Sequence, residues 1–72
     1  MEKENYFAGI LKKLMDEKNI KQIELSENLE VRQSQVSNWL NAKSIPGFYS
    51  IKRIAQYFNV SADYLLGLKE AK

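Results

Sequence analysis

The stretch QIELSENLEVRQSQVSNWLN, residues 22–41, decides how this chain folds. Its apolar residues form two pairs that do not fit one continuous helix. The pairs are Leu25 with Leu29, four residues apart, and Val36 with Trp39, three residues apart. Each pair lies on one face of its own helix, and the register breaks between them at residues 30–32. Because Ser26 is small where the two helices would cross, the stretch predicts two short helices joined by a tight turn.

The second helix of this pair carries uncharged polar side chains on the face opposite its apolar residues. They are Gln33, Ser34, Ser37 and Asn38. Such groups match the donors and acceptors on base edges in the DNA major groove, where Gln or Asn can pair with adenine through two hydrogen bonds. An ordinary solvated face would look the same on an isolated helix. The preceding helix and turn favour the DNA-reading interpretation.

Three segments of the chain, two of which overlap residues 22–41, resemble in their order the DNA-binding domain of the phage-repressor and Cro-like (XRE-type) helix-turn-helix family. They read KNIKQIELSENLEV (18–31), SQVSNWLNAKSIP (34–46) and IKRIAQYFNVSADYLLG (51–67), and the likeness extends from about Phe7 to Gly67. The resemblance implies an all-α, compact five-helix lambda-repressor-like domain with the helix-turn-helix at its second and third helices. We expect one domain over residues 1–72, with helices at about 5–18, 22–29, 33–41, 48–58 and 62–66 and a flexible tail at 68–72.

Composition argues against catalysis. With 72 residues and a hydrophobic fraction of 44%, the chain can build one small core without a deep pocket. It contains no histidine and no cysteine, so it lacks the commonest general base and the commonest ligands of transition metals. We therefore expect no enzyme activity, no catalytic residues, no metal and no cofactor. Apolar runs are too short for a membrane span, and we expect a cytoplasmic protein with no membrane partner.

Charge is distributed unevenly along the chain. Residues 1–30 hold five lysines and seven acidic residues, whereas residues 31–62 hold four cations and no carboxylate. These cations are Arg32, Lys43, Lys52 and Arg53, and we expect the last two to face solvent from the fourth helix. A segment without carboxylates around the second helix of the pair is what a phosphate-facing surface needs.

The resemblance assigns roles to single residues. DNA base reading is expected from Arg32, Gln33, Ser34, Ser37 and Asn38, and contacts to the DNA backbone from Lys21, Gln22, Asn41 and Lys43. Lys21 stands where the family has a capping Ser or Thr, and it cannot accept a hydrogen bond from the backbone. The free amides that it leaves at a helix N-terminus attract a phosphate.

The chain departs from the family pattern at several positions. Glu30 and Ala42 occupy places where the family usually has a left-handed glycine, and we expect Asn41 to take over from Ala42 because asparagine tolerates that conformation better. Many members pair an Arg with a Glu where this chain has Met15 and Leu40, so we expect these two side chains to touch. Trp39 is expected in the core.

Members of the family bind two-fold related operator half-sites as homodimers, with recognition helices about 34 Å apart. The matching contact residues are Ala62, Tyr64 and Leu66, although Tyr64 and Leu66 could equally complete the core. The expected function is sequence-specific binding of double-stranded DNA, most simply as a transcriptional repressor. The alternative is a helical protein-interaction module, or an antitoxin-like domain that uses its apolar C-terminal segment.

Overall fold

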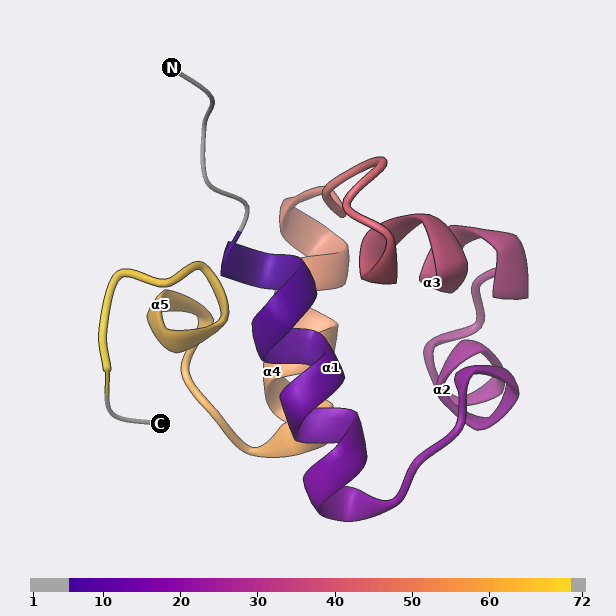
Figure 1. Ribbon diagram of the computed structural model, residues 1–72, viewed down its shortest axis with the longest axis horizontal. Helices are drawn as coiled ribbons and strands as arrows, with labels where there is room; N and C mark the ends of the chain where they lie inside the picture. Colours follow the sequence, from indigo (N-terminus) through magenta and orange to yellow (C-terminus); the bar gives the residue numbers. More distant parts are fainter. Residues whose placement is uncertain (1–5, 71–72) are drawn as a thin grey trace.

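The computed structural model describes residues 6–70, and it is all-helical over that range (Figure 1). The helices are α1 (Tyr6–Lys18), α2 (Gln22–Leu29), α3 (Gln33–Leu40), α4 (Phe48–Phe58) and α5 (Ala62–Leu65). The expected five-helix fold is confirmed, with α3 and α5 each ending one residue earlier than predicted. Asn5, the expected first residue of α1, and residues 71–72 of the expected tail lie outside the described residues.

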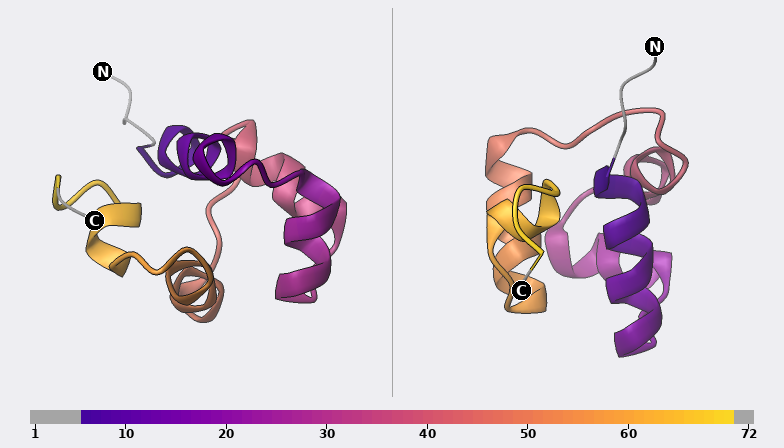
Figure 2. Two further views of the ribbon diagram at one scale, coloured as in Figure 1. Left: turned by 90° about the horizontal axis from the view of Figure 1, so that it is seen from below. Right: turned by 60° about the vertical axis from the view of Figure 1, so that its left-hand side comes forward.

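The helices surround one core. α1 and α4 overlap in Figure 1, but the left view of Figure 2 separates them, with α1 above and α4 below. α2 packs on α3 and α4, while α3 also packs on α1. α5 closes the opposite side by contacting both α1 and α4. The α2–α3 pair therefore forms one end of the molecule, away from α5 (Figure 1).

The core takes apolar residues from every helix. Its buried members are Phe7, Leu11, Leu14, Met15, Leu25, Leu29, Val36, Trp39, Ile51, Ile54, Ala55, Phe58, Tyr64 and Leu65. The expected core position of Trp39 is confirmed, and its ring meets that of Phe7 edge to face at 6.4 Å. Ser26 is buried between α2 and its neighbours, and its hydroxyl donates to the Ile23 carbonyl at 2.8 Å.

Each of the five helices in residues 6–70 ends in the same way. A left-handed residue follows the helix, and the next N–H group reaches back five residues to a carbonyl at 2.8–3.0 Å. The left-handed residues are Asn19, Glu30, Ala42, Asn59 and Gly67, with φ between 56° and 79°. This is the Schellman ending, which satisfies carbonyls that the helix itself leaves without partners.

The two least favourable left-handed residues, Glu30 and Ala42, flank α3. The expectation for Glu30 is confirmed by its φ of 59°. The expected shift from Ala42 to Asn41 is wrong: Ala42 has φ 60° and Asn41 has φ −94°. The reason is that Asn41 uses its side chain at the helix end, donating from Nδ2 to the Ser37 carbonyl at 2.9 Å. A left-handed residue other than glycine or asparagine costs about 1–2 kcal/mol.

No helix within residues 6–70 combines the length and the apolar character that crossing a membrane requires.

Candidate nucleic-acid interface

α3 is held from behind by two buried side chains. Val36 and Trp39 are 0% and 4% exposed, and they face α1 and α2 from the inner side of α3. The opposite side of the helix is open: Gln33, Ser34 and Asn38 are exposed, and Ser37 is half-buried. The sequence-predicted polar row is therefore brought together on one helix, with three of its four side chains at the surface.

The exposed members of this row are free for a partner. Among residues 6–70, the side chains of Gln33, Ser34 and Asn38 take part in no hydrogen bond. Ser37 differs, because its hydroxyl accepts from Asn41 Nδ2 at 3.3 Å. Because the hydroxyl only accepts in this bond, its O–H can still donate to a base edge.

The N-terminus of α3 has a partial cap that the sequence analysis missed. Arg32 occupies the N-cap position with extended backbone angles, and its guanidinium has no acceptor to offer the helix amides. Only the return bond of a capping box is made: the side-chain Oε1 of Gln35 accepts from the Arg32 N–H at 3.2 Å. A Gln three residues after the cap was the available signal. The bond holds the Arg32 backbone and leaves its exposed side chain at the open end of α3.

The N-terminus of α2 is uncapped by any side chain. Lys21 has φ −95° and ψ 162°, and it makes no side-chain cap hydrogen bond, as expected. Lys21 is exposed and Gln22 is half-buried beside it. A free helix N-terminus next to a lysine suits an anionic group.

The expected contact between Met15 and Leu40 falls at this same place. Both side chains line a surface hollow of about 290 Å³ that Lys21 and Gln22 also border. Met15 is 6% exposed, and half-buried Leu40 packs against the core. An apolar pair thus lines this hollow, while direct contact between its members stays a prediction.

The C-terminal end of α3 offers one clear cation. Lys43 is exposed, and its backbone N–H is fixed by the Asn38 carbonyl at 2.8 Å. Asn41 is exposed too, but its Nδ2 already donates to Ser37, and its Oδ1 can only accept. A phosphate oxygen needs a donor, so Asn41 would have to turn to make the expected backbone contact.

One expected surface cation is not free. Arg53 was expected to face solvent from α4, and this is wrong: its side chain is half-buried and bonds to carbonyls at the end of α2. Lys52, its neighbour, is exposed as expected. Periodicity alone could not find this role, because the bond joins residues 24 positions apart.

The expected dimer-contact residues divide by burial. Tyr64 is only 7% exposed and belongs to the core, which was the alternative for it. Ala62 is half-buried, and Leu66 is 40% exposed. The sequence analysis missed a second apolar surface at the start of α4, where Phe48 and Tyr49 are 84% and 69% exposed.

No group of three His, Cys, Asp or Glu residues within the described part of the chain is arranged to hold a metal ion.

Comparison with known proteins agrees with this geometry. Residues 11–65 match a family model described as helix-turn-helix. The chain is 37% identical over 64 residues to the HTH-type transcriptional activator BcrR of Enterococcus faecalis, covering 89% of this chain and 31% of that protein. It is also similar to the crystal structure of a transcriptional regulator from Listeria innocua, with TM-score 0.81, 31% identity, and coverage of 85% of this chain and 57% of that one. The chain thus spans about a third of the curated relative.

Proposed function

This chain belongs to the helix-turn-helix family, which it matches over residues 11–65, and we propose that it regulates transcription by binding double-stranded DNA with α3 in the major groove. The observation that carries the proposal is the open polar row on α3, anchored from behind by buried Val36 and Trp39. A helix fits the major groove, and side chains near its N-terminus reach base edges there.

Base reading is assigned to the exposed N-terminal part of α3. Gln33 and Asn38 carry free amides that can pair with adenine through two hydrogen bonds. Arg32 is exposed at the start of α3, where its planar fork can reach a guanine edge or a phosphate. Ser34 adds a free hydroxyl, and Ser37, whose hydroxyl accepts from Asn41, can still donate its O–H to a base edge.

Backbone contacts are assigned to the two ends of the α2–α3 unit. Lys21 and Gln22 lie at the uncapped N-terminus of α2, and Lys43 follows α3. Such contacts fix the register of the protein on the duplex without reading its sequence. Asn41 joins them if its amide turns outward.

Two finer points belong to the same proposal. The resemblance favours a repressor, whereas the Enterococcus relative is named an activator, and the same mode of DNA binding serves both. Two copies on half-sites about 34 Å apart would match successive major grooves. Ala62 and Leu66 are the expected contact residues that have accessible surface. We propose no reaction for this chain.

A second candidate function is a protein-interaction module. It is favoured by exposed Phe48, which borders a largely apolar hollow of about 330 Å³ between α4 and the start of α5. Exposed Leu66 and Leu68 add apolar surface at the C-terminal segment. Binding of a protein to such a surface would depend weakly on salt, whereas neutralising phosphates releases counterions and makes DNA binding steeply salt-dependent.

The test is selection of duplexes from a random pool by the wild-type chain, followed by titration of the best duplex and a scrambled one at several salt concentrations. We expect the selected duplex to bind at least 10³-fold more tightly, as is usual for specific sites. Equal affinity for both duplexes, or affinity that does not change with salt, would contradict the proposal.

A further inference from the structure

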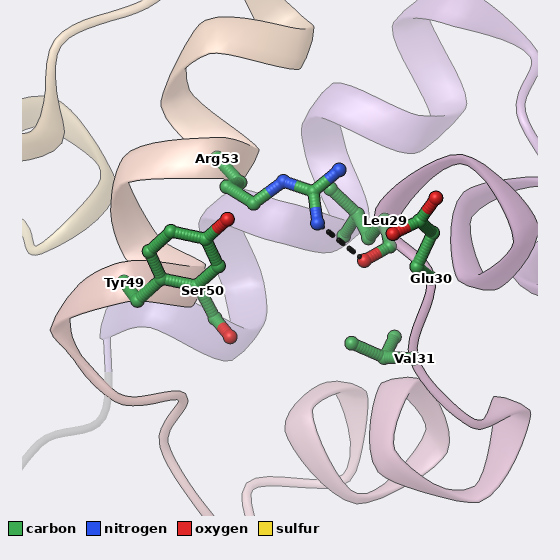
Figure 3. Close-up of a pocket in the computed structure, with 6 residues that line it drawn as sticks. All are labelled: Leu29, Glu30, Val31, Tyr49, Ser50 and Arg53. Carbon is green, nitrogen blue, oxygen red and sulfur yellow. Dashed lines mark hydrogen bonds between the residues drawn. The ribbon is translucent and has the colours of Figure 1, made fainter.

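Arg53 of α4 reaches across to the C-terminal end of α2 (Figure 3). Its Nη1 donates to the Leu29 carbonyl at 2.9 Å, and its Nη2 donates to the Asn28 carbonyl at 3.4 Å. The Tyr49 ring lies on the other side, with its centroid 5.8 Å from the guanidinium carbon. A half-buried cation is thus held between an aromatic ring and the carbonyl end of a helix, both of which favour positive charge.

These two hydrogen bonds complete the end of α2. Of the last four carbonyls of the helix, that of Ser26 accepts from the Val31 N–H at 3.0 Å and that of Glu27 from the Glu30 N–H at 3.3 Å. The remaining carbonyls, of Asn28 and Leu29, have no backbone donor within reach in this ending. Arg53 supplies the missing donors to both, so the last turn of α2 depends on a side chain from α4.

The hydrogen bonds from Arg53 lie next to the turn that connects α2 to α3. Glu30, immediately after Leu29, is the strained left-handed residue, and the chain enters α3 only three residues later. A hollow of about 270 Å³ separates Tyr49 and Ser50 of α4 from the turn residues Glu30 and Val31. Leu29 is buried in the core and Val31 packs against it, but the hollow leaves this side of the turn without side-chain packing on α4, so the Arg53 hydrogen bonds add to core packing in fixing the turn. The hydrogen bond from Arg53 to the Leu29 carbonyl joins α4 to the end of α2 beside this hollow (Figure 3).

We propose that Arg53 is a positioning residue for DNA recognition: by tying the end of α2 to α4 it sets the angle at which α3 leaves the turn and meets the base edges. This inference rests on the proposed function and gives Arg53 no contact with DNA. Recognition needs side chains held within about 0.5 Å and 10–20° of the productive geometry. Phosphate contacts tolerate more, because they depend on charge more than on alignment.

The experiment compares Arg53→Met, which keeps the aliphatic stem and removes the donors, with Arg53→Lys, which can reach one carbonyl. Lys52→Met is the matched control, since it removes the same charge from an exposed neighbour on α4. Each variant is titrated with the duplex selected by the wild-type chain and with a scrambled duplex, across a salt series. Circular dichroism at the same temperature confirms that each is folded.

For Arg53→Met we expect the ratio of selected to scrambled affinity to fall about tenfold, the cost of one misaligned base contact, with no change in the salt slope. Arg53→Lys recovers part of the ratio and serves alone if the Met variant does not fold. Lys52→Met leaves the ratio unchanged. A merely structural role would lower both affinities together, through the folded fraction, and leave the ratio as it was.

Three results would overturn the inference. One is an unchanged ratio in Arg53→Met while the wild-type chain discriminates. Another is an equal loss on both duplexes with a salt slope reduced by about one, which identifies a phosphate contact. The third is a wild-type chain with no preference for any duplex. That result contradicts the proposed function itself, and it is seen with the wild-type chain alone, before any Arg53 variant is measured.

Discussion

Replacing Ala42 by glycine is expected to stabilise the protein. Ala42 has φ 60° and is exposed, so its methyl group contributes strain and little packing. A left-handed L-residue costs about 1–2 kcal/mol, and glycine returns about 0.5–1 kcal/mol through the greater freedom of the unfolded chain. The net gain in the free energy of unfolding is therefore about 0.5–1 kcal/mol. For a domain of this size it corresponds to a rise in Tm of about 2–8 °C.

Urea denaturation monitored by circular dichroism measures the change, with an unaltered dependence on denaturant showing that the unfolded state is comparable. Asn41→Gly is the matched control. It removes the bond from Nδ2 to the Ser37 carbonyl and puts glycine where φ is −94°, so it should lower stability by about 0.5–1 kcal/mol. If Asn41→Gly raises stability and Ala42→Gly lowers it, the left-handed residue is Asn41 and our account of this helix end is wrong.

Four further substitutions test other parts of the molecule. Gln33→Ala should lower the binding free energy for the selected duplex by about 1–3 kcal/mol and relax the preference at one base pair, whereas Lys43→Ala should weaken binding to all duplexes alike. Fluorescence titration measures both affinities. Identical behaviour of the two variants would reject the assignment of α3 as the recognition helix. Ser61→Ala removes the acceptor of the Tyr64 N–H at 3.0 Å and should lower the free energy of unfolding by about 1 kcal/mol in urea; an unchanged midpoint would show that the cap is dispensable. Trp39→Ala removes a side chain that is only 4% exposed and should lower the free energy of unfolding by about 3–5 kcal/mol, a large part of the stability of a small domain. We therefore expect the variant to lose its cooperative thermal transition in circular dichroism. A transition within a few degrees of the wild type would contradict the core position of Trp39.

Much of the fold was readable from local pattern. The spacing of Leu25 with Leu29, and of Val36 with Trp39, places each pair on one helical face whatever surrounds it, because the period of the α-helix is fixed. The predicted bounds of α2 and α4 agree with the structure to the residue, and those of α3 and α5 to within one residue. The polar row on α3 could then be predicted, because it lies on the face of the helix opposite the buried residues.

Helix ends were harder to predict, because backbone hydrogen bonds compete with residue preference. Preference favoured Asn41 over Ala42 as the left-handed residue. In the structure, the bond from the Asn41 amide to the Ser37 carbonyl and that from the Lys43 N–H to the Asn38 carbonyl set the ending one residue later. Two specific bonds outweigh a preference of about 1 kcal/mol.

What the sequence by itself determined is therefore the set of helices, their buried faces and the presence of an open polar row. What only the tertiary structure decided is which polar groups remain available. It buries Tyr64 in the core and turns Arg53 from an expected surface cation into a donor to the end of α2. The physical reason is separation along the sequence. Helical periodicity indicates which residues three or four positions apart lie side by side, whereas the carbonyls that accept from Arg53 come near it only when α4 packs against α2.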